Sequence, residues 1–229
     1  MRETWCRPQF TIDEHAWHEV IVDNTYELPA NLGGKSRIID IGGHIGCFSL
    51  ACLARGAGFV LAVEADPRNY LKLQANLSQF PKRAEVLHAA VLQRDGRPAT
   101  IGIQGYDDND PNTNTGGGSV ITPVAVQTGG GIPTTCLDDL IERVGGVRLV
   151  KIDAEGSEYP ILYGSARLNE VQEFVMEVHH HIPVDASLSL SPEQCTVTAL
   201  ASFLKFKGFK VRFERHPMVT TLFSLWAKR

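Results

Sequence analysis

A glycine-rich loop follows the first apolar run of the chain. The loop reads "DIGGHIG" and spans Asp40 to Gly46. Glycines after a first strand let a ligand approach the backbone closely at the start of a helix. The dinucleotide fingerprint G-x-G-x-x-G is not met, because His44 and Cys47 stand where two of its glycines are needed. The remaining spacing of Asp40, Gly42 and Gly46 indicates either a nucleoside site or a turn whose glycines serve packing alone.

An acidic residue, Glu64, closes the second apolar run 24 residues after Asp40. A carboxylate about 20 residues beyond a glycine loop can accept hydrogen bonds from both hydroxyls of a ribose. Asp66 and Pro67 follow at positions typical of a helix cap and a first helical turn. The loop and the carboxylate together predict a nucleoside cofactor, although Glu64 alone is equally consistent with a solvated strand end.

Further carboxylates follow the third apolar run. The stretch "LVKIDAEGSEYPILYG" places Asp153 at a strand end and Glu155 two residues later, so both can face one cleft if the backbone stays extended. Ligands sit at this edge of the sheet in open α/β folds. Glu158 lies in the first turn of the next helix, where the helix dipole stabilises an acid that has no other role. Carboxylates in such a cleft can stabilise a bound cofactor, orient an acceptor or bind a cation.

Three consecutive histidines, His179 to His181, follow the fourth apolar run in "EFVMEVHHHIP". Neighbouring side chains on a strand point to opposite faces, so the triplet is poor geometry for a metal site. His179 and His181 can share a face, and His181 is a candidate contact for an acceptor or a cation. His180 points away and is expected to be structural.

These residues need a framework that brings the ends of the apolar runs together. The first three runs, at 37–43, 59–65 and 147–156, are continuously apolar and each precedes a helix-like stretch. Such alternation, without a polar face on the strands, indicates a mostly parallel sheet with helices on both faces. The fourth run, at 173–179, precedes a long loop and a helix that we expect to have its N-cap at Ser191.

Two segments of the chain depart from the alternation of strands and helices. Residues 209–215 and 219–229 form two strand candidates around a short "HPM" turn, and we expect an antiparallel hairpin that closes the sheet. Residues 95–133 form an insertion rich in glycine, asparagine and aspartate, which predicts hairpins with a loop at their tip. This insertion is interpreted as a lid over a substrate, or alternatively as a surface hairpin without function.

The composition fits one domain over residues 1–229, with an N-terminal cap segment at 1–36. The chain has 229 residues, of which 43% are hydrophobic and 21% charged. Its formal charge of -4 argues against binding to nucleic acid or anionic membranes. No apolar run reaches the roughly 18 residues of a membrane span and the N-terminus lacks the apolar core of a signal peptide, so a cytoplasmic protein is expected. Five scattered cysteines without a C-x-x-C pair indicate reduced thiols.

The segment from Leu149 to Gly164 resembles the K-I-D-x-E-G-x-E stretch of the FkbM family of methyltransferases. The likeness extends through "TTCLDDLIE", the glycine loop, "VEADPRNYLKLQANL" and "EVH", and it covers most of the chain from about Trp17. The resemblance implies a Rossmann-like methyltransferase fold with a seven-stranded sheet. It also implies S-adenosylmethionine as the methyl donor, usually to a hydroxyl of a sugar, a polyketide or a related metabolite. The chain departs from the family's pattern at His44, where asparagine is more frequent, in the histidine triplet and in the insertion.

The resemblance gives the candidate residues definite roles. Methyl transfer from a sulfonium is an in-line displacement, in which the protein mainly positions the reactants. A hydroxyl acceptor is helped by a general base, and histidine suits this role near neutral pH. We expect His179 to be the base, because it directly follows the strand and matches the family's E-x-H, with Asp153 or Glu155 orienting the acceptor or the imidazole. The residues expected to bind the cofactor are Asp40, Gly42, Gly43, His44, Gly46, Glu64, Ala65, Asn69, Ala90, Asp153 and Tyr26.

Several alternatives stay open at this point. The chain could be an N-methyltransferase, or an enzyme that acts on a carrier-bound substrate. It could also be a metal-assisted enzyme in which Asp153, Glu155 and the histidines bind Mg²⁺, Mn²⁺ or Zn²⁺, although no metal site is favoured. A non-catalytic cofactor-binding module is the most remote interpretation. The expected partner is a small-molecule acceptor, with neither nucleic acid nor a membrane, and the sequence does not set the oligomeric state.

Overall fold

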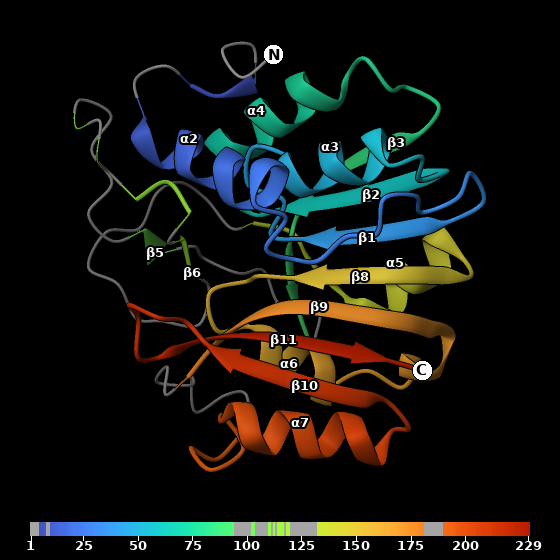
Figure 1. The fold of residues 1–229 in the computed structure, drawn as a ribbon, viewed down its shortest axis with the longest axis vertical. Coiled ribbons are helices and arrows are strands. Elements are labelled where there is room, and N and C mark those ends of the chain that lie inside the picture. The colour runs from blue at the N-terminus through green and yellow to red at the C-terminus, as the bar shows by residue number, and fades with distance from the viewer. Residues whose placement is uncertain are drawn as a thin grey trace.

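A seven-stranded sheet forms the centre of the molecule (Figure 1). The computed structural model describes residues 5–7, 10–93, 102–103, 110, 112, 114–116, 118–119, 132–180 and 190–229. The strand order is β10-β11-β9-β8-β1-β2-β3, and β11 runs antiparallel to both of its neighbours while the other pairs are parallel. This confirms the predicted mostly parallel sheet that ends in an antiparallel hairpin. Its strands are β1 (Arg37–Ile41), β2 (Phe59–Glu64), β3 (Ala84–His88), β8 (Val147–Ile152), β9 (Val171–His179), β10 (Lys210–Arg215) and β11 (Leu222–Lys228).

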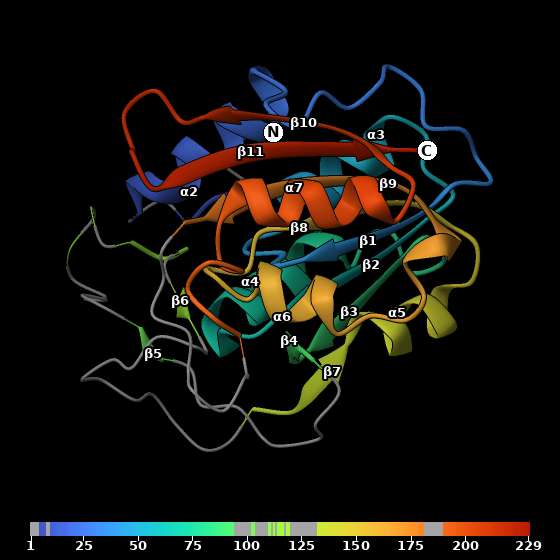
Figure 2. The same cartoon turned by 90° about the horizontal axis from the view of Figure 1, so that it is seen from below.

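Helices cover both faces of this sheet (Figure 2). One buried cluster joins α5, α6 and α7 to one face, and a second joins the N-terminal helices, α3 and α4 to the other. Ile38 and Ile39 of β1 are both fully buried but belong to different clusters. This explains the continuous hydrophobicity, because successive side chains enter opposite cores. The helices are α2 (Thr11–Trp17), the π-helical turn η1 (His18–Val22), α3 (Cys47–Ala54), α4 (Pro67–Leu77), α5 (Leu137–Val144), α6 (Glu158–Tyr163), the short 3-10 turn η2 (Leu168–Glu170) and α7 (Val197–Phe206).

Two small pairs of strands lie outside the main sheet. β4 (Ala90–Leu92) runs parallel to β7 (Thr134–Cys136), and β5 (Gly102–Ile103) runs antiparallel to β6 (Gly118–Ser119). The second pair lies within the predicted insertion at residues 95–133. Most of that insertion lies outside the described residues, so its interpretation as a lid stays a prediction.

The structure confirms one predicted helix cap and corrects another. Asp66 caps α4, since its side chain accepts a hydrogen bond from the backbone N–H of Arg68. The expected cap at Ser191 is wrong, because α7 begins after Thr196, whose hydroxyl accepts from Ala199 N at 3.2 Å. The residues between form a turn, in which Gln194 N donates to Ser191 O. The proline after Ser191 is therefore part of that turn rather than of a helix.

Two structural observations relate to the composition of the chain. All five cysteines are buried, and none of them forms a disulfide in the structure. Among the residues that the structure describes, no helix has both the length and the apolar character needed to cross a membrane.

The glycine loop after β1 depends on close backbone contact. Gly42 has φ +74°, and a Cβ atom placed there would lie 1.7 Å from the backbone oxygen of Asp153. Gly42 N and Gly43 N both donate to Val63 O, at 3.0 and 2.9 Å, and Asp153 N donates to Ile41 O at 3.1 Å. The ends of β1, β2 and β8 therefore meet at a point where no side chain fits.

We predict that Gly42→Ala lowers the free energy of unfolding by more than about 3 kcal/mol, because a backbone group must move to admit the methyl group. Gly33→Ala is a matched control, since Gly33 has φ +82° and a Cβ atom placed there would have nothing within 4 Å. The cost of the control is about 1 kcal/mol of left-handed strain. Urea unfolding of both variants measures the difference. Equal losses of stability would show that the contact with Asp153 does not constrain the loop.

Candidate active site

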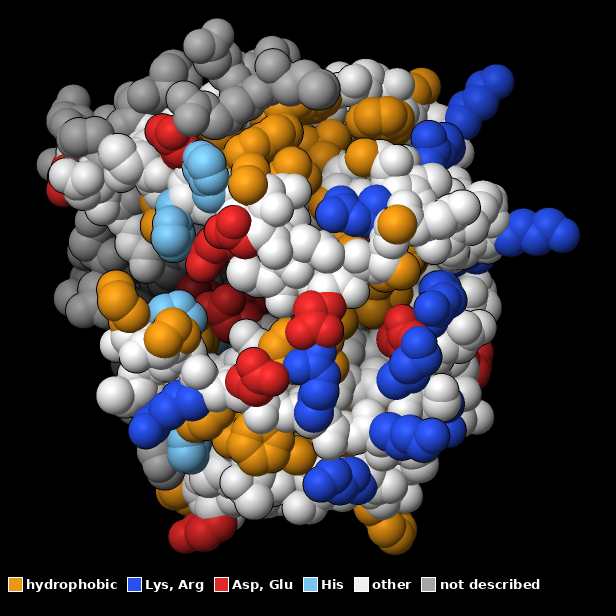
Figure 3. Space-filling view, viewed as in Figure 1, with side chains coloured by type: hydrophobic (Ala, Val, Ile, Leu, Met, Phe, Trp, Pro, Cys, Tyr) orange, Lys and Arg blue, Asp and Glu red, His pale blue; other side chains and the backbone are white. Residues whose placement is uncertain are grey.

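A cavity of about 930 Å³ opens at the carboxyl ends of the central strands. In the space-filling view, acidic and histidine side chains gather around this hollow (Figure 3). Of the residues expected to bind a cofactor, Asp40 and Gly46 do not line it. Those that do are Tyr26, Gly42, Gly43, His44, Glu64, Ala65, Asn69, Ala90 and Asp153. The structure thus brings most of the predicted set into one place, and their binding roles stay predictions.

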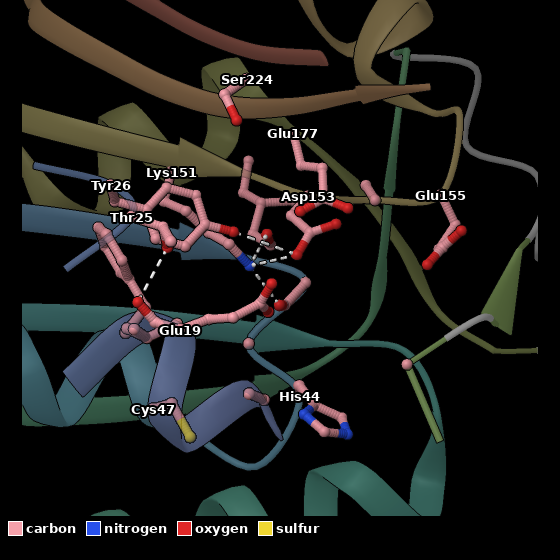
Figure 4. Close-up of a pocket in the computed structure, with 18 of the residues that line it drawn as sticks. Glu19, Thr25, Tyr26, His44, Cys47, Lys151, Asp153, Glu155, Glu177 and Ser224 are labelled. Atoms are coloured by element: carbon pink, nitrogen blue, oxygen red, sulfur yellow. Dashed lines mark hydrogen bonds and ion pairs between the residues drawn. The ribbon is translucent and has the colours of Figure 1, made fainter. Parts of the chain in front are cut away.

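Lys151 connects the glycine loop to the carboxylates of Asp40 and Asp153, and Figure 4 shows its ammonium beside Asp153. Its side chain is 5% exposed, and its ammonium donates to Gly42 O at 2.6 Å. It also lies 3.5 Å from Asp40 Oδ1 and 3.3 Å from Asp153 Oδ2. Burial alone would lower the pKa of Lys151, but the charges of Asp153 and Asp40 outweigh burial and raise it. Asp40 itself is fully buried and accepts from Ser49 Oγ at 2.6 Å, so it supports the loop from below.

Glu64 holds the other side of the loop. Its two carboxylate oxygens accept from His44 N at 2.7 Å and from Asp66 N at 2.8 Å. Burial raises the pKa of Glu64 to about 7, although both hydrogen bonds oppose the shift. The carboxylate lines the cavity while it fixes the loop and the start of α4, so a contact with ribose would add to this structural role.

His44 adopts a left-handed conformation, with φ 48°. Asparagine is the more frequent residue at this position of the family that the sequence resembles, and it also tolerates a left-handed conformation well. The His44 ring lies 2.8 Å from Thr115 Oγ1 and 3.6 Å from Asp13 Oδ1, and Arg7 forms an ion pair with Asp13 at 2.8 Å. Burial lowers the pKa of His44 to about 4, despite the opposing charge of Asp13. The neutral ring therefore links the glycine loop to the N-terminal segment and to the insertion.

Two further candidates, Tyr26 and Asn69, also line the cavity. The Tyr26 hydroxyl donates to Asp153 Oδ2 at 3.4 Å, and its ring packs edge-on against Phe48. Asn69 Nδ2 donates to the backbone oxygen of Thr115 at 2.7 Å. Part of the predicted insertion therefore packs directly on a residue expected to hold the adenosine.

Four side chains at the ends of β8 and β9 form what we call the strand-end cluster: Asp153, Glu155, Glu177 and His179. His179 Nε2 lies 3.3 Å from Glu155 Oε2 and 4.0 Å from Glu177 Oε1. Burial and the charge of Asp153 raise the pKa of Glu177 to about 8, and burial raises that of Glu155 to about 7 despite the opposing charge of His179. Glu155 has φ 49°, which turns its side chain out of the extended direction that the sequence suggested.

His179 is held by carboxylates on both ring nitrogens. Nδ1 lies 3.3 Å from Oε1 of the fully buried Glu158. Burial alone would lower the pKa of His179, but Glu158, Glu155 and Asp153 outweigh burial and raise it to about 10. His179 as general base stays a prediction that the structure disfavours, because a ring that keeps its proton at neutral pH cannot accept another. In addition, His179 is not among the residues that line the cavity.

Of the other two histidines of the triplet, the structure describes His180. His180 packs its ring against Phe223 at 5.5 Å between centroids, and its backbone N–H donates to Thr221 O. This agrees with a structural role. His181 lies outside the described residues.

Among the described residues that line the cavity, carboxylate side chains outnumber those of lysine and arginine. Lys151 and Arg215 supply its lysine and arginine side chains. The carboxylates are Glu19, Asp23, Glu27, Glu64, Asp153, Glu155, Glu177 and Glu214. The thiol of Cys47 also lines the cavity, but burial raises its pKa and keeps it protonated. The cavity therefore favours positively charged ligands.

Sequence reasoning missed Lys151 and Glu177. Both lie two residues before a selected residue, Lys151 before Asp153 at the end of β8 and Glu177 before His179 on β9. Since side chains two apart share a face of a strand, this spacing was a usable signal. Arg7 and Asp13 had no such signal, because their partner His44 is far away in the sequence.

Comparison with known proteins identifies the family. The model of the methyltransferase FkbM domain matches residues 40–211, which is more than half of the chain. The chain belongs to the FkbM methyltransferase family. The match contains the glycine loop, the strand-end cluster and the first residues of the terminal hairpin, so the family assignment covers the candidate active site. A search of curated proteins finds no significant match.

Solved structures with the same fold are distant in sequence. An FkbM methyltransferase from Methylobacillus flagellatus KT is 16% identical, with a TM-score of 0.53 over 99% of this chain and 56% of its own. A precorrin-6y C5,15-methyltransferase from Geobacter metallireducens GS-15 is 11% identical, with a TM-score of 0.50 over 98% and 92% of the two chains. An rRNA methylase from Streptococcus thermophilus gives 11% identity and a TM-score of 0.48 over 91% and 95%. The first two show a Rossmann-like methyltransferase fold for this FkbM-family protein.

We predict that His44→Asn makes the protein less sensitive to acid. The unfolded chain takes up a proton on His44 near pH 6.5, whereas the folded chain does so only near pH 4. Protonation of the unfolded state therefore lowers wild-type stability as the pH falls through this window, and asparagine removes this contribution. Urea unfolding at several pH values between 4 and 6.5 measures the effect. The exposed His15→Asn is the control, and an unchanged acid profile for His44→Asn would contradict the burial of a neutral ring.

Proposed function

We propose that this protein transfers the methyl group of S-adenosylmethionine to a hydroxyl of a small metabolite. The observation that carries the proposal is the acid-lined cavity, which is lined by residues of both the glycine loop and the strand-end cluster. Its volume lies in the upper range of small-molecule sites, which leaves room for a nucleoside cofactor and a modest acceptor.

Family membership and the chemistry of the cavity support S-adenosylmethionine as the donor. Its sulfonium and ammonium groups are cations, which a cavity rich in carboxylates stabilises. Glu64 lies where ribose hydroxyls are bound in related folds, and Asn69 and Ala90 line the same cavity. Several residues of the N-terminal segment between Ile12 and Glu27 also line the cavity, which supports a role of this segment as a cap on a single catalytic domain.

The charge of the cavity favours a small molecule over nucleic acid. The phosphate backbone of a nucleic acid needs lysine and arginine contacts, whereas Glu19, Asp23 and Glu27 line the cavity. Met218 and Val219 lie in the turn between β10 and β11, line the cavity and are 86% and 44% exposed. They offer an apolar rim for the carbon skeleton of an acceptor.

The transfer needs positioning and the removal of one proton. The acceptor oxygen attacks the methyl carbon in line, the carbon–sulfur bond breaks, and S-adenosylhomocysteine leaves with the electron pair. Asp153 and Glu177 line the cavity at the ends of adjacent strands, so the hydroxyl proton passes to the strand-end cluster. We assign this role to the carboxylates of the cluster in preference to His179, whose nitrogens are already paired.

An N-methyltransferase is the second candidate, and one observation favours it. The same excess of carboxylates that attracts a sulfonium also attracts an ammonium acceptor. An amine must lose its proton before it can attack, so both candidates need the strand-end cluster. The two candidates differ in whether the new bond joins the methyl carbon to oxygen or to nitrogen.

We predict that the protein transfers an isotope-labelled methyl group from S-adenosylmethionine to a small molecule in an extract of the source organism. Mass spectrometry detects the added methyl group, and NMR of the product distinguishes an O-methyl from an N-methyl group. Asp153→Asn is expected to lower turnover at least tenfold, whereas Glu85→Gln on the far strand β3 is the control. A labelled nucleic acid without any labelled small molecule would contradict the proposal.

A further inference from the structure

Three side chains of the strand-end cluster have the arrangement of a metal site. One ligand atom from each of Asp153, Glu177 and His179 lies within 4.8 Å of the other two. Glu177 and His179 are two apart on β9 and share a face, while Asp153 follows the adjacent parallel strand β8. Ligands about 2.1 Å from an octahedral ion are about 3.0 Å apart when adjacent and about 4.2 Å apart when opposite. A small inward movement of these side chains is enough to reach those distances.

The imidazole of His179 is oriented by a buried carboxylate. Glu158 is fully buried, and its Oε1 accepts from Ala154 N at 2.9 Å and from Gly156 N at 3.1 Å, which fixes the carboxylate. The same oxygen lies 3.3 Å from His179 Nδ1, so Nδ1 is the donor and Nε2 faces Glu155 and Glu177. A carboxylate that binds the far nitrogen of a histidine is the usual support of a metal-binding imidazole.

Among the described residues, Lys151 and the Tyr26 hydroxyl contact the same oxygen of Asp153, Oδ2, at 3.3 and 3.4 Å. This leaves Oδ1 for a further ligand. Asp153 and Glu177 both line the cavity, and so does Ser157, whose buried hydroxyl has no hydrogen-bond partner among the described residues. The cluster therefore opens towards the acceptor on one side and is held by protein on the other.

We propose that Asp153, Glu177 and His179 bind a divalent cation that accepts both carboxylate and imidazole ligands, such as Mn²⁺, and that this cation holds the acceptor hydroxyl. The role of the ion in methyl transfer rests on the proposed function, but its binding does not. Three protein ligands leave positions open on an octahedral ion. A hydroxyl in one of them is oriented towards the cofactor, and the ion stabilises the alkoxide that forms. The proton passes to Glu155, the carboxylate of the cluster that lines the cavity without being a ligand of the ion.

This assignment gives a role to His179 that does not require it to accept a proton. Without an ion, the ring is paired with Glu155 and Glu158 as an internal cation. With an ion, Nε2 gives up its proton and becomes a ligand. The ion-free and ion-bound states therefore differ in properties that can be measured on the isolated protein.

The test is the binding of Mn²⁺ to the full chain after treatment with a chelator, followed at neutral pH through the electron paramagnetic resonance of the free ion. We expect about one tight site per chain. Glu177→Gln and His179→Gln should each weaken binding at least tenfold. Glu214→Gln is the matched control, because Glu214 also lines the cavity but lies outside the cluster, and it should keep wild-type affinity. The thermal unfolding midpoint of each variant shows whether it is folded.

A second measurement uses the wild-type protein alone. Electron spin echo modulation of the bound Mn²⁺ should show one directly coordinated nitrogen, from His179. No Mn²⁺ binding, no nitrogen coupling, or unchanged binding in the double variant E177Q/H179Q would each overturn the inference. Methyl transfer that persists after exhaustive chelation would overturn the role of the ion while leaving the proposed function intact. Mn²⁺ binding without any methyl transfer would overturn the proposed function while leaving the metal site intact.

Discussion

The buried ammonium of Lys151 is the interaction on which the arrangement of the site depends. It donates to the carbonyl of Gly42 and lies between the carboxylates of Asp40 and Asp153. A buried charge is tolerated only when it is paired and hydrogen-bonded. The loop after β1 and the end of β8 are therefore fixed relative to each other by electrostatics, and Gly42 makes the contact possible by having no side chain. The ammonium of Lys151 therefore fixes the residues at the base of the cavity relative to each other.

The excess of negative charge in the cavity is the second constraint. Glu155 and Glu177 lie close to Asp153, and burial together with mutual repulsion raises the pKa of both. Such a concentration of carboxylates is stabilised by any cation that enters it. The proposed sulfonium donor and the proposed divalent ion would each relieve this repulsion. The same physical cause thus connects the proposed cofactor with the proposed metal.

The sequence predicted the fold well because the signals were local and strong. Continuous apolar runs that end in glycine or acid placed the ends of β1, β2 and β8 at one edge, and so brought Asp153 close to the glycine loop. Tertiary electrostatics were not accessible in the same way. His179 had the type and position of a base, but the buried Glu158 that pairs with it comes from the start of α6 and was interpreted as a helix-start acid. The incorrect cap at Ser191 has a different cause, since a serine followed by proline suits a turn as well as a helix.

Calorimetric titration of the purified protein with S-adenosylmethionine and, separately, with NAD tests the central claim most directly. The account predicts one binding site for S-adenosylmethionine per chain and no binding of NAD, because the loop lacks the spacing that a pyrophosphate needs. S-adenosylhomocysteine should compete for the same site. Binding of NAD without binding of S-adenosylmethionine would contradict the account.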